Sequence, residues 1–251
     1  MVADSDSNFR ATCNVLFGRD IGNLAAFSQY LKSDVDAPMQ AKSAISGKIV
    51  YLSQPHYCKG AVFADVSELP QAGAALSIND IKDVDSALGA LSEKFCYCGN
   101  KNLGTSQGVF ESDMCNDSMD ILSSLNVMSS KHVAYCNGIR ASECAYGCML
   151  GGEVGFSIKS QIFFYSKRCF DSCLCFHCTD IYCSFNCSDC TEALFSFNQK
   201  SKRHIIGNVE LPKDKYVSIK AKLVGEIADI LSAKKSFPQI FELAKGGGNI
   251  G

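Results

Sequence analysis

A small or apolar residue stands at every third position from Leu103 to Ser196. Two classes of residue alternate in this series, so the true period is six. From Ser106 onward the first position of the hexad is Ser or Cys in fifteen of sixteen repeats, with Val154 as the exception. The fourth position is mostly Ile, Val, Cys or Ala. A short fixed repeat of this kind predicts a stacked architecture in which each repeat buries its face against its neighbours.

Both repeated positions can face inward only if the chain bends within each hexad, because residues three apart in a strand point to opposite faces. The third position offers such a bend, since its residue types tolerate left-handed conformations: Asn102, Gly108, Asp120, Asn126, Gly138, Asp180, Asn186 and Asn198. We therefore expect a mainly β protein, a parallel β-solenoid with three hexads, about 18 residues, to each coil. The buried hydroxyls should bond to backbone groups at the bends. A polyproline-type bundle, which also has period three, is disfavoured because no proline occurs between Leu103 and Ser201.

The segments on either side of the hexads predict helices. Residues 1–99 are expected to form a mixed α/β region, with a strand at Asn14–Phe17 and a first, irregular coil at 46–66. An apolar stripe that includes Val84, Leu88 and Leu91 predicts a helix over 79–95. The regular solenoid is expected over 100–206, a second helix within 207–245, and a flexible tail over 246–251. Because bare solenoid ends aggregate, we interpret the two helices as caps at both ends.

Composition points to an intracellular protein. The net charge of −2 offers no basic footprint for nucleic acid. The polar, acidic N-terminus is unlike a signal peptide, and no apolar run approaches the roughly 20 residues of a membrane span. The fifteen cysteines, an odd number, favour a reducing compartment over a disulfide framework. We expect a cytoplasmic protein without nucleic-acid or membrane partners.

Three segments carry a resemblance to a known group: Ser130–Cys136, Cys169–Cys178 and Asn186–Cys190. They resemble uncharacterised cysteine-rich proteins of bacteria and archaea known from metagenomes, which repeat hexads of the form Ser/Cys-x-Asn-Val/Cys-x-Tyr. The resemblance covers roughly residues 112–216 and implies a solenoid-like fold. Members of that group also carry an N-terminal zinc-ribbon-like module with paired CxxC motifs, which this chain lacks. Hexapeptide-repeat acyltransferases are similar in repeat length only, because their inward residues are spaced four and two apart.

Seven cysteines between Cys169 and Cys190 allow two interpretations. Thiolate clusters of this density hold zinc or iron–sulfur centres in other proteins. Five of the seven, however, occupy the repeated inward positions, where free Cys serves as a small hydrophobe. We favour this structural role and expect no cofactor. If a metal is bound, the candidate ligands are Cys173, His177 and Cys183, whose places the repeat does not explain.

Catalytic motifs are missing from the sequence, since the four histidines are scattered and no nucleophile elbow or phosphate loop occurs. We therefore expect a non-enzyme, a rigid scaffold that mediates protein–protein assembly or self-assembly. Outward aromatic residues would supply its binding surface: Tyr135, Tyr146, Phe170, Phe176, Tyr182 and Phe195. Two alternatives remain open. One is a zinc or iron–sulfur protein that uses residues 169–190, and the other is a component of a larger particle, such as a viral one.

Overall fold

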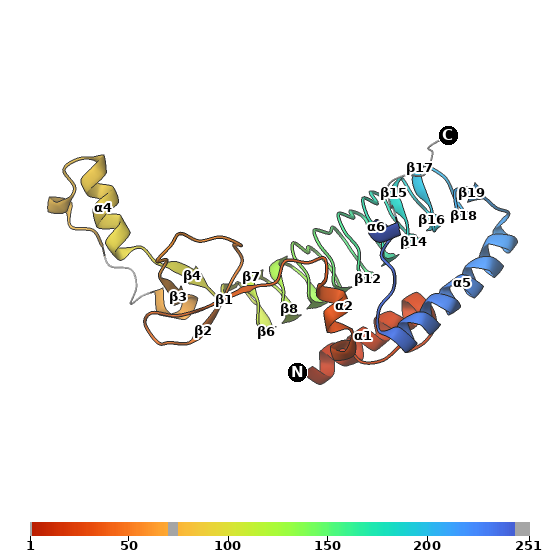
Figure 1. Ribbon diagram of the computed structural model, residues 1–251, viewed down its shortest axis with the longest axis horizontal. Helices are drawn as coiled ribbons and strands as arrows, with labels where there is room; N and C mark the ends of the chain where they lie inside the picture. Colours follow the sequence, from red (N-terminus) through yellow and green to blue (C-terminus); the bar gives the residue numbers. More distant parts are fainter. Residues whose placement is uncertain (1, 70–74, 244–251) are drawn as a thin grey trace.

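The hexads wind into a parallel β-solenoid in the computed structural model, which describes residues 2–69 and 75–243. The solenoid has two faces (Figure 1). One face, here the covered face, is a single sheet of ten strands, with order β19-β18-β16-β14-β13-β12-β11-β10-β8-β6. These strands are β6 (Gln107–Phe110), β8 (Met119–Leu122), β10 (Lys131–Ala134), β11 (Cys144–Tyr146), β12 (Phe156–Ile158), β13 (Arg168–Phe170), β14 (Asp180–Tyr182), β16 (Glu192–Leu194), β18 (Ile205–Ile206) and β19 (Val209–Glu210).

The opposite face, here the open face, is less regular. Its strands are β5 (Asn102–Leu103), β7 (Asp113–Asn116), β9 (Leu125–Met128), β15 (Phe185–Ser188) and β17 (Phe197–Lys200). Single parallel bridges through Asn137, Met149, Gln161 and Cys173 connect β9 to β15 across the middle rungs. The predicted β-solenoid is thus confirmed.

Each coil contains 12 residues rather than the 18 expected. Gln107 pairs with Met119, and Met119 pairs with Lys131, so the register advances by twelve at every rung. The reason is a left-handed residue at a second position that occurs in most hexads. Besides the third position, the sixth is left-handed, as at Ser123 (φ 47°) and Ser129 (φ 48°). The sixth residue directly precedes the Ser or Cys at the first position of the next hexad, which we call the corner residue. The chain therefore reverses at the end of the hexad, and two hexads close a coil.

The predicted bends at the third position are present at six of the eight residues named above, with Asn102 and Asp180 as the two exceptions. The same position is also left-handed at Met114, His132, Leu150, Ile162 and Leu174. Met, Leu and Ile do not favour that conformation. The repeat, and not the individual side chain, therefore imposes the backbone geometry there.

Corner Ser and Cys residues join successive rungs through their side chains. Ser124 N donates to Ser112 Oγ (3.0 Å), and Cys136 N donates to Ser124 Oγ (3.1 Å), each across 12 residues. The same hydroxyl of Ser124 donates to Leu122 O (2.8 Å) in its own rung. Cysteine substitutes for serine in this pattern, because Cys148 N donates to Cys136 Sγ (3.3 Å). The expectation that buried hydroxyls bond to backbone groups at the bends is confirmed at these corners.

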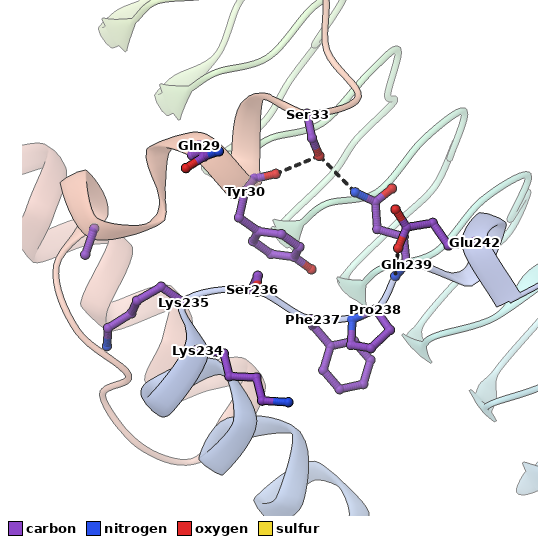
Figure 2. A pocket seen from close by; sticks show the side chains of 11 residues that line it. Gln29, Tyr30, Ser33, Lys234, Lys235, Ser236, Phe237, Pro238, Gln239 and Glu242 are labelled. Atoms are coloured by element: carbon purple, nitrogen blue, oxygen red, sulfur yellow. Dashed lines mark hydrogen bonds between the residues drawn. The ribbon is translucent and has the colours of Figure 1, made fainter.

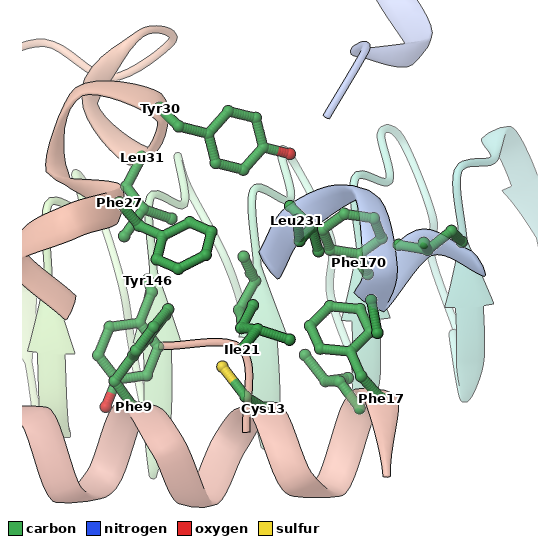
Figure 3. Packing of buried hydrophobic residues seen from close by; sticks show 14 of the residues in the cluster. Phe9, Cys13, Phe17, Ile21, Phe27, Tyr30, Leu31, Tyr146, Phe170 and Leu231 are labelled. Atoms are coloured by element: carbon green, nitrogen blue, oxygen red, sulfur yellow. The ribbon is translucent and has the colours of Figure 1, made fainter. Parts of the chain in front are cut away.

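Helices cover one side of the solenoid lengthwise. Helix α1 (Val2–Phe17), the 3-10 helix η1 (Leu24–Phe27), α2 (Ser28–Lys32) and α5 (Lys213–Lys234) contribute to one apolar cluster with the outward residues of the covered face. Phe9, Cys13 and Phe17 project from α1 towards Tyr146 and Phe170 of the sheet (Figure 3). The strand predicted at Asn14–Phe17 is wrong, because these residues form the last turn of α1 and continue its buried helical stripe.

A helix near each end is confirmed, but neither packs as the expected cap. Helix α4 (Val84–Lys94) has no buried residue and projects away from the solenoid (Figure 1). Helix α5 buries Tyr216, Val224, Ile227, Ala228 and Leu231 along the covered face instead of across the end of the solenoid. Phe237, beyond α5, packs edge-on against Phe170, and α6 (Ile240–Leu243) follows.

Strands preceding the repeats cover the first rung. β1 (Met39–Lys42) and β2 (Ile49–Leu52) are antiparallel, and β3 (Phe63–Asp65) pairs parallel with β4 (Tyr97–Gly99). Buried Asp113 accepts hydrogen bonds from Ser53 N and Lys101 N, both 2.8 Å, which ties this region to the solenoid. Residues 46–66 therefore do not form the coil expected there, since their strands are outside the twelve-residue register. The expected tail at 246–251 lies outside the described residues.

We predict that Ser124→Ala lowers the free energy of unfolding by about 1–3 kcal/mol, because the buried N–H of Cys136 loses its acceptor. Ser157→Ala is the matched control, since the Ser157 hydroxyl is buried and has no hydrogen-bond partner within residues 2–69 and 75–243. Its removal should cost less than about 0.5 kcal/mol. Urea titration followed by circular dichroism measures both values. Equal losses in the two variants would contradict the role assigned to the corner hydroxyl.

Candidate functional site

The three candidate metal ligands lie in different surroundings. Cys183 is buried in the cluster beneath the helices. His177 is on the surface, where its Nδ1 lies 2.6 Å from Asp189 Oδ1 and its ring lies 5.0 Å from that of Tyr165. Cys173 is buried and bridges Gln161 and Phe185 on the open face. In the part of the chain that the structure describes, no three His, Cys, Asp or Glu side chains are grouped so that they could hold a metal ion.

Inward cysteines instead form a connected string inside the last rungs. Neighbouring thiols interact in a chain of pairs, Cys169 with Cys178, Cys178 with Cys175, Cys175 with Cys190, and Cys190 with Cys187. Thiol donors on both sides lower the pKa of Cys178, whereas the same bonds together with burial raise the pKa of Cys169 and Cys175. These side chains fill the interior beside Ile181 and Ala193.

We predict that most thiols stay unreactive until the protein unfolds. Burial raises the pKa of Cys115 to about 12, so the nucleophilic thiolate is scarce there. Neighbouring thiols lower the pKa of Cys178 and Cys190, but both side chains are buried and a water-soluble reagent does not reach them in the folded protein. Cys58 is exposed, and Cys96 and Cys98 are partly exposed. A water-soluble disulfide reagent added to the metal-free native protein should therefore modify Cys58 first, and the remaining cysteines only in denaturant. Rapid native modification of Cys175 or Cys187 would contradict this, as would stoichiometric zinc or iron retained by the protein and lost in a Cys173→Ser, Cys183→Ser variant.

A pocket of about 620 Å³ lies between α2, the end of α5 and the arm that leads to α6 (Figure 2). Ser33 Oγ donates to Tyr30 O (3.0 Å) and accepts from Gln239 Nε2 (2.8 Å). Lys159 forms an ion pair with Asp34 (2.5 Å) and donates to Ser33 Oγ (2.7 Å). These groups satisfy one another across three segments, so the polar contacts hold the C-terminal arm against the solenoid.

Asp171 holds the same C-terminal arm through one hydrogen bond. Its Oδ2 accepts a hydrogen bond from Ile240 N (3.0 Å). Burial raises the pKa of Asp171 to about 7, and the charges of Asp34 and Glu242 add to this, while the Ile240 bond and Lys159 oppose it. The carboxyl group is therefore protonated in the folded protein at a pH where an unfolded Asp is ionised.

The raised pKa of Asp171 predicts that the free energy of unfolding decreases as the pH rises. The stabilisation by protonated Asp171 is complete below the unfolded pKa, near 3.8. It is lost as the pH rises through about 7, because only the folded state holds the proton in that range. Asp171→Asn keeps an acceptor for Ile240 N and removes the titration. The variant should therefore gain about 1–3 kcal/mol relative to wild type between pH 5 and pH 8. Urea unfolding at both values tests this, and an unchanged difference between the two proteins would contradict it.

Histidines near the surface take part in pairs between neighbouring rungs. His132 lies 3.1 Å from Asp120, and His204 lies 2.7 Å from Glu192, in each case twelve residues along the chain. His177 and Asp189 have the same spacing. These pairs explain the three histidines as contacts along the solenoid.

Five of the six aromatic residues expected on an exposed binding surface lie beneath the helices or at their edge. Tyr135, Tyr146, Phe170 and Tyr182 are buried in the cluster that the helices form with the covered face, and Phe195 packs against it. Tyr182, for example, donates its hydroxyl to Leu16 O of α1 (2.9 Å). Only Phe176 of this set is exposed, at 37%.

The open face carries an apolar patch that sequence reasoning missed. Leu150, Phe164 and Tyr165 are 50%, 45% and 60% exposed and, with Phe176, form what we call the aromatic patch. The rings of Phe164 and Phe176 are stacked, with centroids 5.6 Å apart and planes 10° apart. Both residues occupy the same place on adjacent rungs, twelve apart. The rings therefore stack along the solenoid axis.

A glycine borders this stack. A Cβ at Gly152, one rung before Phe164, would lie 1.9 Å from Phe164 O, so only glycine fits there. The preceding rung consequently has no side chain to cover Phe164. Phe164 therefore stays exposed to solvent.

Comparison with known proteins gives no further guide, because neither a family model, nor a curated protein, nor a solved structure matches the chain. In the described residues, no helix is both long enough and apolar enough to cross a membrane. The assignment of function therefore depends on the geometry above.

Proposed function

We propose that this protein is a non-catalytic scaffold, a rigid β-solenoid that binds a protein partner through the aromatic patch of its open face. One contrast between the faces carries the proposal. On the covered face, the outward apolar residues from Ala134 to Leu194 are buried in the cluster with α1, α2 and α5, whereas on the open face Leu150, Phe164, Tyr165 and Phe176 are exposed. Exposed apolar groups gathered on one face are typical of binding surfaces.

The chemistry of the patch favours a protein partner. Aromatic side chains are enriched at the centres of protein interfaces, where they bury a large area at low entropic cost. Phe164 and Phe176 stack on each other and present ring edges outward, which suits apolar side chains better than the flat face of a sugar or a base.

The regular interior supports a structural role. Corner hydrogen bonds join several successive rungs, and Ser33 and Gln239 of the pocket beside α2 bond to each other, which helps to hold the C-terminal arm. All fifteen cysteines are free thiols. Free thiols in this number fit a reducing compartment, so we place the scaffold in the cytoplasm.

We predict that Phe164→Ser combined with Phe176→Ser abolishes partner binding while the fold is retained. Val217→Ser is the matched control, because Val217 is 52% exposed on the outer side of α5. Cross-linking and affinity capture from the native extract should give a protein that wild type and control retain and that the double variant loses by at least about tenfold. Equal capture by all three proteins, or no protein retained by wild type, would contradict the proposal.

A further inference from the structure

Helix α4 presents its whole apolar stripe to solvent. Val84, Leu88 and Leu91 are 73%, 58% and 44% exposed, and Ile81 and Phe95 continue the stripe at 39% and 49%. An amphipathic helix normally buries such a stripe, and an isolated helix of 11 residues has little stability in water by itself. The stripe therefore has the character of an interface whose other half is not found among residues 2–69 and 75–243.

Helix α4 is followed by a cluster of packed aromatic residues and lies beside a groove. Tyr97 of β4 makes edge-on contacts with Tyr57 (4.7 Å) and Phe95 (4.8 Å), and Phe63 of β3 lies against Tyr57 (5.1 Å). The groove holds about 390 Å³ between α4 and residues 58–62, and apolar side chains, including Val62 and Leu91, line most of it. The stripe and the groove are adjacent, so one surface offers both protruding side chains and a hollow to receive them.

The charges around the stripe indicate which partner suits it. Residues 82–94 contain two basic residues, Lys82 and Lys94, and three acidic ones, Asp83, Asp85 and Glu93, which leaves a net charge of −1. At the start of the helix, Lys82, Asp83 and Asp85 sum to −1, and Asp83 is the N-cap, whereas Glu93 and Lys94 leave the end neutral. Two copies of α4 packed antiparallel would place each acidic start beside the Lys94 end of the other copy and would oppose the two helix dipoles. A parallel pair would place the two acidic starts together.

We infer that two copies of this chain associate through an antiparallel α4–α4 contact, with the stripe of each helix seated on the stripe and groove of the other. An anionic membrane fits the same surface poorly, because the segment lacks the excess of Lys and Arg that such helices use. The contact is separate from the aromatic patch and leaves it free, so the dimer presents two open faces.

The test is sedimentation velocity of the full-length protein over a wide range of concentrations. Wild type should form a dimer, and Leu88→Glu combined with Leu91→Glu should raise the dissociation constant at least about 100-fold, because two large apolar side chains per copy lose their burial. Glutamate is a good helix former, so α4 itself is retained. Val217→Glu, an exposed apolar site on α5, should dimerise like wild type.

Orientation is tested separately with salt and charge. In the antiparallel arrangement, Lys94→Glu should weaken the dimer several-fold at low salt, and the difference from wild type should shrink at high salt. A wild-type protein that stays monomeric, a dimer that survives Leu88→Glu with Leu91→Glu, or binding of monomers to neutral phosphatidylcholine vesicles through α4 would each overturn the inference. Phe164→Ser with Phe176→Ser should leave the dimer intact, which separates this outcome from the fate of the proposed function.

Discussion

The side chain of the corner Ser or Cys is the contact on which this structure depends. It accepts the backbone N–H of the equivalent residue in the next rung and, as at Ser124, donates to a carbonyl two residues earlier in its own rung. At a sharp reversal the backbone groups cannot all pair with each other, and an unpaired buried N–H is costly. A small side chain with both a donor and an acceptor solves this at corners such as Ser112, Ser124 and Cys136. Serine and cysteine meet the requirement in a space too narrow for larger residues.

The narrow corners explain why the interior of the solenoid is thin and why it contains many cysteines. The inward residues between two corners are short apolar groups, and Cys169, Cys175 and Cys187 occupy them in the last rungs. In this setting cysteine is a substitute for Val, Ile or Ser of neighbouring rungs, which explains the density of thiols between residues 169 and 190. Function is then left to the outside of the solenoid, where the two faces differ.

Much of the fold can be predicted from the sequence, and the errors have clear physical causes. The hexad predicts the solenoid because inward residues are under the same constraint in every repeat. The coil length was wrong because the left-handed sixth position is held by residues such as Tyr135 and Lys159, which give no sign of positive φ. A signal did exist. The fifth position alternates between an apolar column, with Tyr146, Phe170 and Tyr182, and a mixed column, with Arg140 and Ser188, so the outward residues repeat every twelve.

The same alternation explains which parts of the candidate site could be predicted from the sequence and which could not. The apolar column lies under helices, and α1 was missed because its first residues are polar and its stripe begins only at Phe9. The stripe of α4 was recognised, but a stripe indicates burial and does not indicate by what. The aromatic patch requires the twelve-residue register, since only that register places Phe164 beside Phe176.

Hydrogen–deuterium exchange of the corner amides tests the central claim most directly. If the corner side chains hold the rungs together, the amides of Ser124, Ser130 and Cys136 exchange only when the whole solenoid unfolds. Their protection should then equal the global free energy of unfolding and fall in parallel with it as urea is added. Corner amides that exchange as fast as those of the loop at residues 54–61 would contradict the account.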